Sequence, residues 1–156
     1  MYEVDSLSSS IIIYCIAAFK FSVTGQPVHR PQKIVHDGKY TKESFDGQYQ
    51  ITLKVQDKIV AQNDVDISFN ISDSSGRPIT NLEPLMAAGG HSVIISSDLK
   101  EFLHVHPTEE VNTNWHGDPD ISFKTNFPKP DLYRAWGKFQ HQGMVITSAG
   151  FILKVE

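Results

Sequence analysis

The chain has 156 residues, 40% of them hydrophobic, which suits one folded domain with a sizeable core and excludes a fully disordered chain. Its formal net charge is −4, and it contains no basic run or basic stripe interleaved with aromatic residues, so nucleic acid is excluded as an expected partner. The single cysteine, Cys15, rules out an internal disulfide and any Cys-x-x-Cys motif. A metal site in this chain would therefore use histidine, methionine or carboxylate ligands.

Residues 1–48 are predicted to be an apolar segment followed by a polar linker. Residues 11–19 (IIIYCIAAF) have the length of a signal-peptide core and are too short to span a bilayer. Glu3 and Asp5 precede this run, and the positive residues expected before an export signal are missing. Residues 11–23 can therefore be a degenerate signal or anchor, an added strand, or a disordered tail. The polar stretch 28–47 is typical of a linker, and we expect the folded domain to span residues 49–156.

The rest of the chain alternates between short strand-like runs and turns. Alternating or apolar β-rich runs bounded by turns predict strands at 49–55, 65–71, 92–97, 102–106, 121–127, 132–140, 144–147 and 151–155. Residues 81–90 contain Pro84 and a glycine pair, which favours a short turn or helical piece. We therefore expect an all-β fold, an antiparallel two-sheet immunoglobulin-like sandwich of about seven strands after an irregular N-terminal segment. Trp136 is predicted to help fill its core.

Three of the seven histidines lie within sixteen residues, in or directly before one predicted hairpin formed by residues 92–97 and 102–106. Side chains alternate between the two faces of a strand, so His104 and His106 point the same way. If the turn is centred between Asp98 and Leu99, Val93 lies opposite His104 and His91 opposite His106. The three imidazoles then share one face, whereas a shift of one residue would send His91 to the other face.

This histidine arrangement is typical of a metal site. Imidazole is the commonest metal-binding side chain near neutral pH, and His91, His104 and His106 can supply three nitrogens. Met86 could add a thioether, which would favour copper, especially Cu(I), over zinc. The alternative is that the histidines are structural and that the sandwich is a protein-interaction or accessory module.

A third interpretation is a cupin-type metalloenzyme. The spacing of His104, His106, Glu110 and Gly117 resembles most of a first cupin motif and would suit iron, manganese or zinc. Position 98 is Asp where that motif begins with Gly, and no second cupin motif follows. The remaining histidines lie in or beside loops and the linker, and are predicted to be solvated; they are His29, His36, His116 and His141.

Other catalytic signatures are missing from the sequence. It has no Gly-x-Ser-x-Gly elbow and no glycine-rich loop that precedes a helix to cradle a phosphate. The acidic pair Glu109–Glu110 is typical of a solvated loop. These observations favour a non-enzymatic protein.

Several short motifs are similar to a known family. The most specific is Gly90-His91, Ser97-Asp98-Leu99 and then Phe102-x-His104-x-His106-Pro107. With the other shared motifs, this pattern resembles the YtkA-like (FixH-related) extracytoplasmic domains across most of residues 65–155. The other motifs are 65–73 with Gly76-x-Pro78, Leu82-x-Pro84-x-Met86, Phe127-Pro128, Leu132-Tyr133, Trp136, Phe139-Gln140 and Gly143.

The resemblance implies an immunoglobulin-like sandwich in a periplasmic, secreted or membrane-anchored protein associated with heavy-metal and copper handling. It implicates His91, His104 and His106 as metal ligands, with Met86 as a weaker addition. Copper is the expected ion and zinc the second choice, and a membrane protein of metal handling is the expected partner. Leu85, where an aromatic residue would be unsurprising, leaves the expected site intact.

Overall fold

Residues 35–112 and 115–156 are described by the computed structural model, and they form nine β-strands and no helix. Cys15, His29 and the apolar run 11–23 lie outside the described residues. The strands are β1 (Thr41–Glu43), β2 (Tyr49–Val55), β3 (Asp64–Asp73), β4 (His91–Ser96), β5 (Phe102–Val105), β6 (Asp120–Asn126), β7 (Asp131–His141), β8 (Met144–Thr147) and β9 (Phe151–Val155). The predicted all-β class is therefore confirmed.

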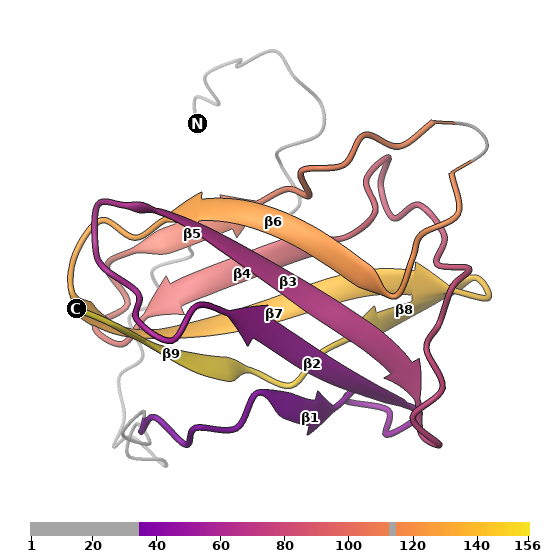
Figure 1. The fold of residues 1–156 in the computed structure, drawn as a ribbon, viewed down its shortest axis with the longest axis horizontal. Helices are drawn as coiled ribbons and strands as arrows, with labels where there is room; N and C mark the ends of the chain where they lie inside the picture. The colour runs from indigo at the N-terminus through magenta and orange to yellow at the C-terminus, as the bar shows by residue number, and fades with distance from the viewer. Residues whose placement is uncertain (1–34, 113–114) are drawn as a thin grey trace, which may run out of the picture. The chain divides into compact units, whose positions relative to one another are not determined.

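The strands form two antiparallel sheets that pack as the two layers of a sandwich (Figure 1). One sheet has the order β1-β2-β3-β6, and the other has the order β5-β4-β7-β8, with β9 also paired to β7. Short β1 lies within the stretch 28–47 and pairs with β2. Two isolated bridges, Ser44 with Ser148 and Pro107 with Phe123, connect the sheets along their edges.

The core lies between the sheets because each strand turns alternate residues inward. Along β3, for example, Ile67, Phe69 and Ile71 are fully buried. The Phe69 ring packs against Phe123 of its own sheet at a centroid distance of 5.6 Å. It also packs against Phe139 of the other sheet at 5.5 Å. Phe69 thus joins the two layers at their centre.

The prediction that Trp136 fills the core was wrong. Along β7, Tyr133, Ala135 and Phe139 are fully buried, so the residues between them face outward. Trp136 accordingly lies half-buried on the outer face, beside Val93 of β4. The buried tryptophan is Trp115, which packs over the backbone of Gly117.

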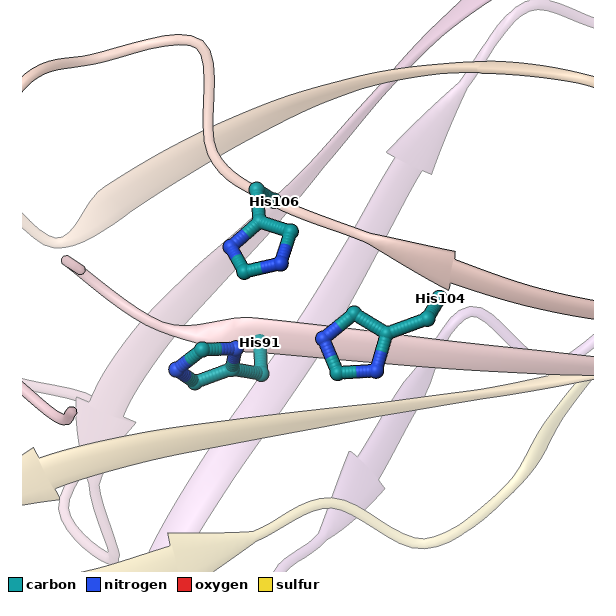
Figure 2. A group of neighbouring side chains, drawn as sticks. All are labelled: His91, His104 and His106. Carbon is teal, nitrogen blue, oxygen red and sulfur yellow. The ribbon is translucent and has the colours of Figure 1, made fainter. Parts of the chain in front are cut away.

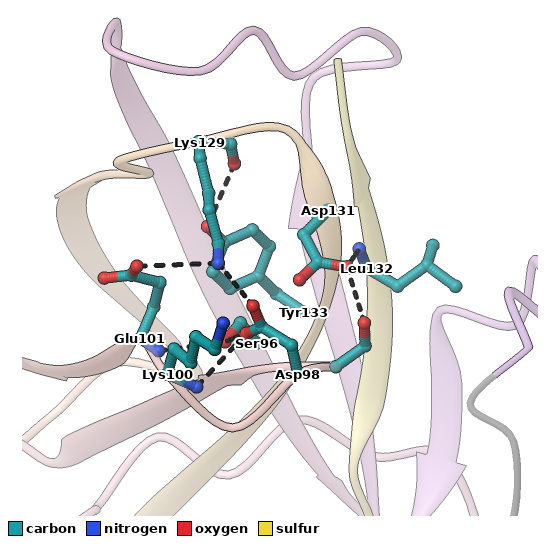
Figure 3. Close-up of polar contacts among 9 residues, drawn as sticks. Ser96, Asp98, Lys100, Glu101, Lys129, Asp131, Leu132 and Tyr133 are labelled. Carbon is teal, nitrogen blue, oxygen red and sulfur yellow. Dashed lines mark hydrogen bonds and ion pairs between the residues drawn. The ribbon is translucent and has the colours of Figure 1, made fainter.

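A polar clamp fixes the turn between β4 and β5 (Figure 3). The Asp98 carboxylate accepts hydrogen bonds from Lys129 at 2.6 Å and from the Ser96 hydroxyl at 2.6 Å. These contacts and the backbone N–H of Lys100 hold the pKa of Asp98 well below its usual range. The backbone N–H of Glu101 binds Ser96 Oγ, and Leu99 adopts a positive φ of 61°. The clamp ties the hairpin turn to the loop between β6 and β7.

Residues 35–112 and 115–156 contain no helix that could span a lipid bilayer.

Replacing Phe69 by Ala is expected to lower the free energy of unfolding by about 3–5 kcal/mol, because it removes a buried ring and leaves a cavity between the sheets. Urea denaturation followed by circular dichroism measures this loss. The exposed Val145→Ala is the control, with an expected change within about 0.5 kcal/mol. An equal loss in both variants would contradict the central position of Phe69.

Candidate metal centre

The β4–β5 hairpin has the register predicted from the sequence. Val93 pairs with His104, and Ser92 pairs with Val105. The same ladder continued by one residue brings His91 level with His106. Directly opposed residues point to the same face, so the three histidines share the outer face of the sheet. Figure 2 shows the three rings gathered between β4 and the β5 strand end.

The three rings are neighbours in space. Their centroids are 5.1 Å apart for His91 and His106, 5.6 Å for His91 and His104, and 4.8 Å for His104 and His106. One nitrogen from each ring can be chosen so that all three nitrogens lie within 4.8 Å of one another. His91 is buried, His104 is half-buried and His106 is exposed. The cluster therefore has a closed side at His91 and an open side at His106.

A backbone hydrogen bond fixes the tautomer of His91. Its Nε2 lies 3.0 Å from the carbonyl oxygen of Leu85. A carbonyl oxygen only accepts hydrogen bonds, so Nε2 carries the proton and, in the neutral ring, Nδ1 carries a free lone pair. Nδ1 is buried and has no hydrogen-bond partner within the described residues. Such an atom is unusual in a folded protein and calls for an explanation.

The segment that supplies this carbonyl is a tight turn. Leu85 and Ala88 exchange backbone hydrogen bonds of 2.7 and 3.1 Å, and the two residues between them, Met86 and Ala87, have positive φ values of 48° and 63°. This is the form of a two-residue hairpin turn, usually made with Asn and Gly. The predicted short turn in residues 81–90 is confirmed.

Gly90 brings the chain from this turn into β4. A Cβ at this position would lie 2.7 Å from the Phe139 ring and 2.9 Å from the Lys138 carbonyl oxygen. Only glycine allows the backbone to approach β7 so closely. This close approach places His91 at the start of the strand.

The environment favours the neutral form of two of the three rings, His91 and His104. Burial lowers the pKa of His91; the Leu85 hydrogen bond opposes this shift, whereas the charges of His106 and Lys138 add to it. Burial also lowers the pKa of His104, and His106 and His91 add to the effect. Neutral imidazoles are the form that binds metal ions.

The other histidines differ in their surroundings. His36 and His116 are exposed, as predicted. The prediction that His141 is solvated was wrong: it is 6% exposed, with Nδ1 2.9 Å from the Tyr49 hydroxyl and Nε2 3.1 Å from Asn81 Oδ1. Both of its ring nitrogens are engaged, so His141 is a hydrogen-bonded structural residue.

Two further candidates from the sequence are Glu110 and Met86. Glu110 is exposed and is not part of the histidine group, and the sheets form a sandwich, so the arrangement that the alternative cupin interpretation requires is not present in the described part of the chain. Met86 is 56% exposed and follows Leu85, which contacts the Nε2 side of His91. Its role as a ligand stays a prediction.

Sequence reasoning missed two groups beside the cluster. One is Lys138, which lies opposite His91 in the β4–β7 ladder. The other is the Leu85 carbonyl, which accepts a hydrogen bond from the His91 ring. Finding Lys138 requires the pairing of strands more than thirty residues apart, and a backbone carbonyl leaves no mark in the side-chain pattern. The glycine pair between Leu85 and His91 was the one local feature of the sequence that could have indicated a close approach of these two residues.

One known protein family matches most of the chain. Residues 42–156, from β1 to the C-terminus, match the family described as Domain of unknown function (DUF8832). The chain belongs to this family. No curated protein matches the chain. The family match covers the whole histidine cluster and the turn that supports it.

The lowered pKa values of His91 and His104 predict a pH-dependent stability. Both residues should titrate below about 6.5 in the folded protein, while in the urea-unfolded chain they titrate near that value. The folded state then binds fewer protons than the unfolded chain, so the free energy of unfolding falls as pH drops below about 6.5. An NMR titration of the imidazole Cε1–H signals measures the two pKa values, and urea denaturation at a series of pH values measures the free energy of unfolding. Titration of both rings above 6.5 would contradict the prediction.

Proposed function

We propose that this protein is a non-enzymatic metal-binding domain, with His91, His104 and His106 as ligands and copper as the preferred ion. The observation that carries the proposal is the buried, unpartnered Nδ1 of His91 beside two other imidazoles. A bound ion would use this lone pair. The Leu85 carbonyl at Nε2 is the kind of outer partner that metal-binding histidines commonly have, because it fixes the tautomer and ring orientation.

The spacing of the rings supports this proposal. Two nitrogens bound to one tetrahedral ion at about 2.0–2.1 Å lie roughly 3.4 Å apart. The nitrogens of the cluster already lie within 4.8 Å of one another. His104 and His106 are not enclosed by the core, so rotation of their side chains can close the remaining distance while His91 stays fixed.

Copper is favoured by the kind of donors present. Imidazole suits both copper and zinc, while a thioether favours Cu(I). Met86 is the methionine nearest in sequence to the cluster, at the tip of the turn that binds His91. We include it as a further ligand in the Cu(I) form of the site.

Metal buffering or delivery is the role that follows. One open side at His106 permits exchange with another molecule, which for a delivery protein would be a membrane partner. The sequence resemblance to YtkA-like domains supports this role and a periplasmic or otherwise extracytoplasmic location.

The alternative is an interaction module in which the histidines are structural. Structural histidines would lie on different faces or each bind the backbone. His91 does bind the backbone, but all three rings share a face and leave His91 Nδ1 without a partner in the described protein. These contacts favour the metal site.

Removing a ligand should weaken metal binding strongly. We expect His104→Ala and His106→Ala each to lower the affinity for Cu(II) and for Zn(II). The loss should exceed the roughly 10–100-fold that follows from mutating a group that only hydrogen-bonds to a metal ligand. Competition titration with a chromophoric chelator measures these affinities. His116→Ala is the matched control, since His116 is exposed and lies outside the cluster. Unchanged affinity in both ligand variants would remove the proposed site.

The role of Met86 is tested separately. Met86→Leu should lower the affinity for Cu(I) relative to Zn(II), because leucine keeps the volume of the side chain and removes the sulfur. Met144→Leu is the control, because Met144 is equally exposed, at 54% against 56%. Equal Cu(I) affinities in the two variants would show that Met86 is not a ligand, and would leave the histidine site in place.

A further inference from the structure

The open side of the cluster leaves room for another ligand. His91 closes one side at 5% exposure, whereas His106 at the end of β5 is exposed. The group contains no Asp, Glu or Cys from the described residues. An ion held by three neutral imidazoles therefore keeps its full positive charge and an unfilled coordination position.

A second positive group lies on the side of β4 away from His104 and His106. Lys138 is directly opposite His91 in the β4–β7 ladder, so their side chains leave the same face with Cβ atoms roughly 4.5–5.5 Å apart. Lys138 is exposed, and it takes part in none of the ion pairs formed within residues 35–112 and 115–156.

We propose that the metal-loaded site binds a small carboxylate-type anion, such as acetate or bicarbonate, between the ion and the Lys138 ammonium. This inference rests on the proposed metal site. A planar oxyanion has two oxygens, one for the ion and one for the ammonium, and it compensates the charge that three neutral ligands leave. The anion would lie on the outer face of the sheet and cross β4 at His91, from the ion on the β5 side to Lys138 on β7.

The test uses the full chain loaded with Cu(II). Sodium acetate or sodium bicarbonate is added at constant ionic strength in a non-coordinating salt, and the visible absorption of the copper is followed. We expect a saturable spectral shift with each anion. Lys138→Gln should weaken the anion affinity by roughly two- to fivefold, the range of an exposed ion pair. Lys100→Gln is the matched control, because Lys100 is exposed and lies at the other end of the hairpin.

Each outcome separates this inference from the proposed function. Copper binding with no spectral shift would overturn the anion site and leave the metal site standing, whereas no copper binding would overturn both. Equal anion affinities in wild type and Lys138→Gln would overturn the two-point arrangement. A shift that occurs only in Met86→Leu would place Met86 in the fourth position and overturn the inference.

Discussion

The register of the β4–β5 hairpin is the constraint on which the histidine cluster depends. Side chains alternate along both strands, so one residue of slip would separate His91 from His104 and His106. The polar clamp around Asp98 fixes the turn at one end of the hairpin, and the cluster lies at the other end. The exposed turn thus helps to set the positions of the three histidines, because the β4–β5 ladder between them is only a few residues long.

Placing the cluster on the outer face solves a problem of solvation. Three histidines on the inner face would lie among the phenylalanine rings of the core, where unpaired polar atoms are costly. On the outer face only His91 is buried, and the turn at Leu85 supplies a partner for one of its nitrogens. The cost of burial is then confined to one atom, Nδ1, which is the atom that an ion would satisfy.

Local patterns predicted most of the strands and the cluster, while long-range packing decided the rest. The period-two pattern of β2 gave its bounds, and the short hairpin gave the histidine register because both depend on nearby residues. In β7, apolar residues occur on both faces, so the pattern could not tell whether Trp136 or Phe139 points inward. His141 was misjudged because its partners, Tyr49 and Asn81, lie on distant segments.

The turn behind His91 has an energetic cost that its contacts must offset. Each left-handed residue costs about 1–2 kcal/mol when it is not glycine, and Met86 and Ala87 are both left-handed. The paired hydrogen bonds between Leu85 and Ala88 contribute about 1 kcal/mol each, and burial of the Leu85 side chain adds to them. Glycines would remove the strain but increase the freedom of the unfolded turn. In the folded turn the two hydrogen bonds between Leu85 and Ala88 hold the Leu85 carbonyl in place, and with it the tautomer of His91.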